Sequence, residues 1–146
     1  MNPRERVYIA LGSNLGDRAA LLARAREAIG RMPLTTVLAA SGIEETEAVG
    51  PPGQGQYLNQ MLLVETSLDP GRFLKLLHKI EDENGRTRTE RWGPRTLDLD
   101  IVRFGTRRLR DHDLKIPHPE LPNRDWWQRE IEELDRLAPV KRENDA

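Results

Sequence analysis

The chain has 146 residues, a formal net charge of −1 and no cysteine. This length fits one domain over residues 1–146, and the composition excludes disulfides, thiolate metal sites and a cysteine nucleophile. The near-zero charge argues against a general nucleic-acid binder. Because there is no signal-peptide pattern and no apolar run of membrane-spanning length, we expect a cytoplasmic protein. We also expect residues 141–146 to form a disordered tail.

The first half of the chain predicts a strand, a helix and a second strand. Residues 7–11 form an apolar strand, and the following turn offers Asn14 or Asp17 as a helix N-cap. The second strand is expected at roughly 36–45. The Gly/Pro-rich segment 46–56 predicts an irregular loop, which we interpret as a mobile lid because a linker is unexpected inside so small a domain. The apolar stripe of the helix comprises Leu15, Leu22, Ala25, Ile29 and Met32.

The second half continues with a strand at 57–66 and a helix that Asp69 and Pro70 open and Gly85 ends. A fourth strand at 97–102, a short edge strand at 108–110 and a polar helix at 128–137 follow. The order β-α-β-β-α-β predicts a ferredoxin-like α+β fold, an antiparallel sheet with helices packed on it and an extra C-terminal helix. The stripe of the second helix comprises Phe73, Leu74, Leu77 and Ile80.

Two carboxylates alternate with apolar residues in the fourth strand. Asp98 and Asp100 share one strand face, roughly 6–7 Å apart by strand rise. Like charges this close favour a bound cation, and Mg²⁺ is held by one or two carboxylates together with water and phosphate oxygens. Arg95, just upstream, suits phosphate oxygens. An Asp-x-Asp pair also occurs on solvated strand faces, so the motif alone leaves both interpretations open.

Arginines surround this pair, which suggests a discrete polyanionic ligand in an otherwise near-neutral protein. For the last three of them we prefer exposed loop and edge-strand positions, where positive charge blocks unwanted strand pairing. The set comprises Arg86, Arg88, Arg91, Arg95, Arg103, Arg107, Arg108 and Arg110.

Acidic residues crowd the last turn of the second helix, where the helix dipole disfavours them. Glu81 is either neutralised by Arg86 and Arg88, which the residues alone favour, or required as an acid in a site. His78 shares a helix face with Glu81. His118 lies between two prolines in a rigid extended segment, which fits a ligand contact better than a core role.

The aromatic residues also indicate a ligand. The chain has three Trp, two Tyr and two Phe, and four of these rings lie at turns or loop edges. Rings in such positions stack on flat ligands or lie over guanidinium groups, so we expect a flat heteroaromatic ligand. The four are Tyr57, Trp92, Trp126 and Trp127.

The segment Arg91-Trp92-Gly93-Pro94-Arg95-Thr96-Leu97-Asp98-Leu99-Asp100-Ile101-Val102 closely resembles the signature of the 6-hydroxymethyl-7,8-dihydropterin pyrophosphokinase (HPPK) family of folate biosynthesis. Similar segments lie at 9–16, 45–46, 57–59, 80–81 and 116–119, and the resemblance spans about residues 7–124. It implies the ferredoxin-like fold and transfer of pyrophosphate from ATP to the pterin hydroxymethyl group, releasing AMP. We expect a monomer that uses ATP and the reduced pterin and binds neither nucleic acid nor membrane.

The resemblance also implies roles for individual residues. Asp98 and Asp100 would hold two Mg²⁺ ions and, with Arg86 and Arg95, would be catalytic. It makes Glu81 and His78 functional rather than structural. The implied ATP contacts are His78, Glu81, Arg86, Arg88, Arg95, Ile101, His118 and Arg124. The implied pterin contacts are Thr46, Val49, Tyr57, Asn59, Trp92, Arg95, Asp98 and Trp126.

The sequence departs from the family at Ala48, where proline is frequent, and after Arg124, where the chain is more polar. Trp126 rather than Trp127 is assigned to the pterin by position. Two rival functions are a ferredoxin-like nucleic-acid module and another Mg²⁺ enzyme with an Asp-x-Asp pair, such as a glycosyltransferase. The first predicts aromatic residues in mid-strand and a positive charge; the second predicts a longer, doubly wound α/β chain.

Overall fold

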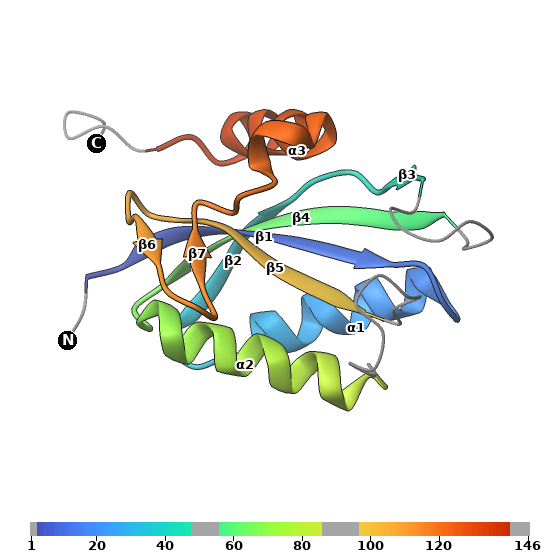
Figure 1. Ribbon diagram of the computed structural model, residues 1–146, viewed down its shortest axis with the longest axis horizontal. Helices are drawn as coiled ribbons and strands as arrows, with labels where there is room; N and C mark the ends of the chain where they lie inside the picture. The colour runs from blue at the N-terminus through green and yellow to red at the C-terminus, as the bar shows by residue number, and fades with distance from the viewer. Residues whose placement is uncertain (1–2, 48–55, 86–96, 141–146) are drawn as a thin grey trace.

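The computed structural model describes residues 3–47, 56–85 and 97–140 (Figure 1). Within these ranges, no helix has the length and apolar character needed to cross a bilayer. The elements are β1 (Glu5–Ser13), α1 (Arg18–Gly30), β2 (Thr35–Ala40), β3 (Glu44–Thr46), β4 (Tyr57–Thr66), α2 (Pro70–Glu83), β5 (Asp98–Phe104), β6 (Leu109–Arg110), β7 (Lys115–Ile116), the 3₁₀ turn η1 (Leu121–Asn123) and α3 (Asp125–Leu137).

The main sheet confirms the ferredoxin-like prediction. Its strand order is β2-β4-β1-β5, and every pairing is antiparallel. β3 also pairs with β4, while β6 and β7 form a separate two-stranded sheet. α1 and α2 cover one face of the main sheet and α3 lies over the other (Figure 1). β5 is therefore the edge strand next to β1, with helices on both sides of the sheet.

The strand predicted at 36–45 is interrupted, and its prediction as one continuous element was wrong. β2 ends at Ala40, and the hydroxyl of Ser41 then accepts a hydrogen bond of 2.9 Å from the backbone N–H of Met61. Gln60 Nε2 donates to the Ser41 carbonyl at 2.7 Å. Pairing with β4 resumes at Glu44. A side-chain acceptor at Ser41 thus bridges the break between β2 and β3.

The alternation predicted for the fourth strand separates two hydrophobic cores. Leu97, Leu99 and Ile101 belong to the core beneath α1 and α2. Val102 belongs to the second core, beneath α3. Because successive side chains of a strand point to opposite faces, Asp98 and Asp100 lie on the α3 face. The fold thus fixes which side of the sheet carries the carboxylate pair.

The caps predicted for the first two helices are confirmed. Asp17 accepts a hydrogen bond from the Ala20 N–H, and Asp69 accepts one from the Arg72 N–H. Gly85, just beyond α2, has a φ of +81°, which favours glycine. Leu15 is 48% exposed, so its place in the buried stripe of α1 was wrong.

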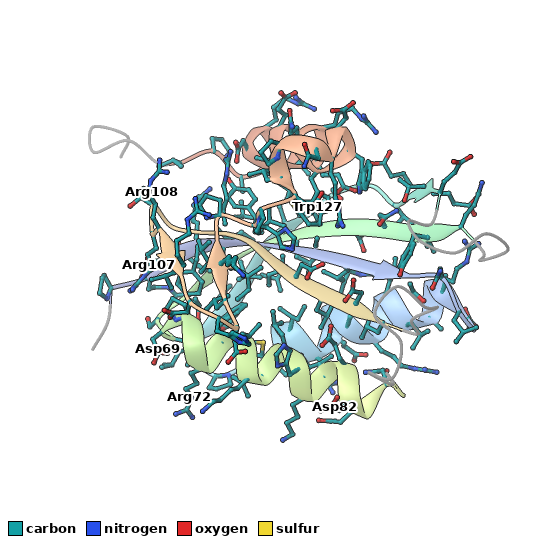
Figure 2. All side chains as sticks on the ribbon, in the orientation of Figure 1. Asp69, Arg72, Asp82, Arg107, Arg108 and Trp127 are labelled. Atoms are coloured by element: carbon teal, nitrogen blue, oxygen red, sulfur yellow. The ribbon has the colours of Figure 1, made fainter. Side chains whose placement is uncertain are left out.

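The C-terminal helix differs from its prediction. α3 begins three residues earlier than expected, at Asp125, and buries Trp127, Ile131 and Leu134. Spacing of four and three residues is that of an amphipathic helix. The predicted C-terminal helix is therefore confirmed, and its buried stripe was not foreseen. Figure 2 shows Trp127 between α3 and the sheet. The helix is also held by a hydrogen bond from the Tyr8 hydroxyl to Asp135.

Candidate active site

A pocket of about 400 Å³ lies at the β5 edge of the sheet. It brings together residues from α2, from β5 and from the segment 112–120. Six of the residues predicted for the site line it: His78, Glu81, Asp98, Asp100, Ile101 and His118. The other lining residues are Leu74, Leu99, His112, Asp113, Leu114, Lys115, Pro119 and Glu120.

The carboxylates of Asp98 and Asp100 are half-buried in this pocket. Oxygen donors on one strand face suit Mg²⁺, which is held by few protein carboxylates and keeps water and substrate phosphates as its other ligands. Among the described residues, no three His, Cys, Asp or Glu side chains form a group that could hold a metal by themselves. The donor set therefore fits Mg²⁺ bound together with a phosphate ligand, and not a cage made of protein alone.

Glu81 supports the strand that carries this pair. Its side chain is fully buried, and Oε2 accepts a hydrogen bond of 2.8 Å from the backbone N–H of Leu99. The acid in the last turn of α2 is thus directed inward to β5, and its requirement as an acid in the site stays a prediction. Neutralisation by Arg86 and Arg88 involves residues outside the described ranges.

His118 lines the pocket from the segment that follows β7. Its backbone N–H donates to the Val102 carbonyl at 2.9 Å, which attaches the segment to β5. Nδ1 accepts a hydrogen bond of 3.1 Å from the Glu120 N–H, so the ring proton lies on Nε2. Nε2 is 3.8 Å from Asp100 Oδ1. The imidazole therefore presents an N–H donor beside the carboxylate pair.

A second group of predicted residues lies on the α3 face of the sheet. The strand register pairs Asn59 with Gly12 and Gly12 with Asp98, so these three form one row across β4, β1 and β5. Asn59 Nδ2 donates to Thr46 Oγ1 at 2.7 Å. A Cβ on Gly12 would lie 3.3 Å from Tyr57 Cδ1. Thr46, Tyr57 and Asn59, all assigned to the pterin, thus gather beside Gly12.

Gly12 and Lys115 are residues that the sequence reasoning missed. The turn after the first strand was assigned only a capping role, although residues 9–16 belong to the segments that resemble the family. Lys115 is the only Lys or Arg among the described residues that line the pocket. It directly precedes Ile116-Pro117-His118, and this proximity to a predicted ligand contact was the available signal.

Arg124 and the two tryptophans of α3 form an aromatic group near His118. The Arg124 Cζ atom is 4.4 Å from the centroid of the Trp127 ring and 5.9 Å from that of Trp126. Trp127 is 2% exposed. Trp126 is half-buried against the second core, and its buried Nε1 has no hydrogen-bond partner among the described residues. Neither tryptophan lines the pocket, so the pterin contact of Trp126 stays a prediction.

Several predicted site residues lie outside the described ranges: Val49, Arg86, Arg88, Trp92 and Arg95. Most of the predicted lid at 46–56 lies there too. Arg107 lies near β6 (Figure 2) and is not among the residues that line the pocket. Its guanidinium forms hydrogen bonds of 2.8–3.1 Å with the Glu5 carboxylate, which raise the pKa of Arg107. This contact gives Arg107 a structural role.

Comparison with known proteins agrees with this arrangement. Residues 8–136 match the model of the family described as 7,8-dihydro-6-hydroxymethylpterin-pyrophosphokinase (HPPK). The chain is 45% identical over 117 residues to 2-amino-4-hydroxy-6-hydroxymethyldihydropteridine pyrophosphokinase of Bacillus subtilis, covering 80% of this chain and 70% of that protein. The Haemophilus influenzae protein of the same name is 40% identical over 119 residues, covering 82% and 74%.

Solved structures show the same fold at low sequence identity. An HPPK-DHPS protein in complex with substrates superposes with a TM-score of 0.56 and 12% identity, over 99% of this chain and 34% of the longer one. Wild-type Plasmodium falciparum HPPK-DHPS with pterin and p-hydroxybenzoate gives a TM-score of 0.52 at 12% identity, over 97% and 33%. The chain thus spans about a third of these solved chains.

Proposed function

The chain belongs to the 7,8-dihydro-6-hydroxymethylpterin-pyrophosphokinase family, and from this we propose that it transfers the terminal diphosphate of ATP to the hydroxyl of 6-hydroxymethyl-7,8-dihydropterin in folate biosynthesis. The products are AMP and the pterin diphosphate. The monomeric state, the cytoplasmic location and the absence of nucleic-acid or membrane partners stay predictions from the sequence.

One observation supports this function above the others, namely that Asp98 belongs to two sites at once. It lines the edge pocket with His78, Glu81 and His118, and it is the register neighbour of Gly12 in the row that continues to Asn59. Cross-strand neighbours are about 5 Å apart. A nucleotide in the pocket and a flat ring beside Asn59 would therefore meet at the carboxylate pair.

The described residues support this reaction by positioning and electrostatics. Phosphoryl-type transfer needs in-line placement and stabilisation of charge, and no protein nucleophile is required. The N–H at Nε2 of His118 and the ammonium of Lys115 are donors for phosphate oxygens on the pocket side. Asn59 and Thr46, held together by their hydrogen bond, would fix the edge of the pterin. Glu81 holds β5 in place between the two substrates.

We propose that Asp98 and Asp100 hold Mg²⁺, and that two ions bind with ATP. When bound, Mg²⁺ would neutralise charge on the phosphates and orient them. The support is the pair of half-buried carboxylates on one strand face, whose remaining metal ligands would come from water and phosphate. The proposed contacts of Arg86, Arg88, Trp92 and Arg95 rest on the resemblance alone.

Product analysis with ATP, Mg²⁺ and the reduced pterin tests the proposal. Formation of AMP and a pterin diphosphate in equal amounts, measured by anion-exchange chromatography and ³¹P NMR, is the expected result. Release of ADP, or pterin-independent release of phosphate, would contradict it. The rival nucleic-acid module has less support, because α3 and its core cover part of the sheet face that ferredoxin-like RNA-binding domains use for base stacking.

A further inference from the structure

Trp127 connects two residues that come from different segments of the chain. Its ring and that of His118 have centroids 4.9 Å apart and planes at 89°, an edge-to-face arrangement. The guanidinium carbon of Arg124 is 4.4 Å from the centroid of the same indole, within the range of a cation–π contact. A single indole therefore contacts both the imidazole at the pocket and the guanidinium at the start of α3.

The indole itself is firmly held. Trp127 is 2% exposed and packs in the second core with Met61, Val102 and Ile131. Core side chains are close-packed and occupy few rotamers, so a ring in this position is a rigid reference surface. His118 is held by two hydrogen bonds. Its backbone N–H donates to the Val102 carbonyl, and its Nδ1 accepts from the Glu120 N–H. These two hydrogen bonds and the contact with the Trp127 ring together restrict the orientation of the imidazole.

We propose that Trp127 is a positioning residue for nucleotide binding, which holds His118 at the pocket and Arg124 at the start of α3 so that both donate to the same phosphate chain. This inference rests on the proposed function, since it takes the polyphosphate of ATP as the ligand. Long, flexible Arg side chains lose conformational entropy on binding, and a stacked guanidinium loses less. Trp127 thus supports ATP affinity through its neighbours and touches no reacting atom.

The test uses Trp127→Leu and Trp127→Phe in the full chain. In Trp127→Leu we expect the KM for ATP, and the Kd for ATP measured by calorimetry without pterin, to rise about three- to tenfold, the scale of one lost aromatic contact. The KM for the pterin should change less than twofold. Trp127→Phe retains a ring and should restore most of the ATP affinity. In a His118→Ala background, Trp127→Leu should have a clearly smaller effect, because residues that act together are not additive.

Ile131→Ala is the matched control, since Ile131 lies one helical turn further along α3 in the same core but has no ring to place beside His118. It should lower the melting temperature and leave the KM and Kd for ATP unchanged. The proposal is overturned if Trp127→Leu and Ile131→Ala change ATP affinity equally, or if both leave it unchanged. Failure of the wild-type chain to form AMP and pterin diphosphate would instead refute the proposed function, and ATP calorimetry would still decide the role of Trp127.

Discussion

Glu81 in the last turn of α2 is fully buried and accepts a hydrogen bond of 2.8 Å from the backbone N–H of Leu99, the residue between Asp98 and Asp100. The contact links the helix to the middle of the carboxylate pair without using either aspartate side chain. It therefore controls where the strand presents both carboxylates, and disturbing it should affect stability and activity together.

Glu81→Ala should lower the free energy of unfolding by about 1–3 kcal/mol, because it leaves the Leu99 N–H buried without its acceptor. Turnover should fall at the same time as the β5 backbone shifts. Glu81→Gln retains an oxygen acceptor, so its free energy of unfolding and its turnover should fall less than those of Glu81→Ala. Urea denaturation and initial rates measure the two effects. Glu83→Ala, at an exposed position of the same turn, is the control and should resemble wild type.

Asp98→Asn and Asp100→Asn should each reduce turnover by about 100-fold or more, the usual cost of removing one electrostatic contact to a transition state. The free energy of unfolding should stay equal or rise slightly, since one of two neighbouring like charges is removed. Initial rates across a Mg²⁺ titration check the metal role. Asp111→Asn, an exposed residue outside the pocket, serves as control. Wild-type rates in either site variant would exclude the aspartates as metal ligands.

Gly12→Ala tests the row across the sheet. The added Cβ would lie 3.3 Å from Tyr57 Cδ1, so the Tyr57 ring would have to shift by a few tenths of an ångström, while the 3.6 Å to Asn59 Oδ1 is an ordinary contact. We expect the KM for the pterin to rise several-fold while the KM for ATP stays constant, as steady-state kinetics would show. Gly42→Ala, whose Cβ meets nothing within 4 Å, is the matched control. An equal rise in both KM values would argue against a separate pterin surface at Gly12.

Glu130 gives the unfolding free energy a pH dependence. Burial, together with the nearby Glu44 and Glu133, raises the pKa of Glu130 to about 8, against about 4.3 in an unfolded chain. Between these values the folded state binds a proton that the unfolded state releases, so stability falls as pH rises from about 4.5 to 8, by up to roughly 1.4 kcal/mol per pH unit.

Glu130→Gln should flatten this slope and stabilise the protein near pH 7.5, because the amide carries no charge in either state. Urea denaturation at several pH values measures it. Glu132→Gln, exposed on the same helix, should retain the wild-type slope. Parallel slopes for wild type and Glu130→Gln would show that Glu130 titrates normally in the folded protein.

Much of the fold could be predicted because local signals agreed with each other. The caps at Asp17 and Asp69 and the alternation around Leu99 are encoded within a few residues, and each is present in the structure. The C-terminal helix was predicted, but its many charges obscured the buried stripe of Trp127, Ile131 and Leu134. That stripe was the signal that the second sheet face is also covered.

The site was predicted less completely, for a different physical reason. Register between strands far apart in sequence depends on the packing of both faces and cannot be read from one strand. The row of Asn59, Gly12 and Asp98 was therefore invisible, although two of its members were predicted individually. The resemblance to the family indicated which residues to consider for the site. The structure shows which of them line the edge pocket and which lie on the α3 face of the sheet.

The position of β5 at the edge of the sheet has one further consequence. Exposed edge strands offer unpaired backbone groups to other chains and so promote strand addition and aggregation. Here the outward N–H of Leu99 is occupied by Glu81 and the carbonyl of Val102 by the N–H of His118. The residues that shape the pocket also shield this edge from intermolecular pairing. Of these two contacts only that of Glu81 uses a side chain, so substitution of Glu81 can lower solubility as well.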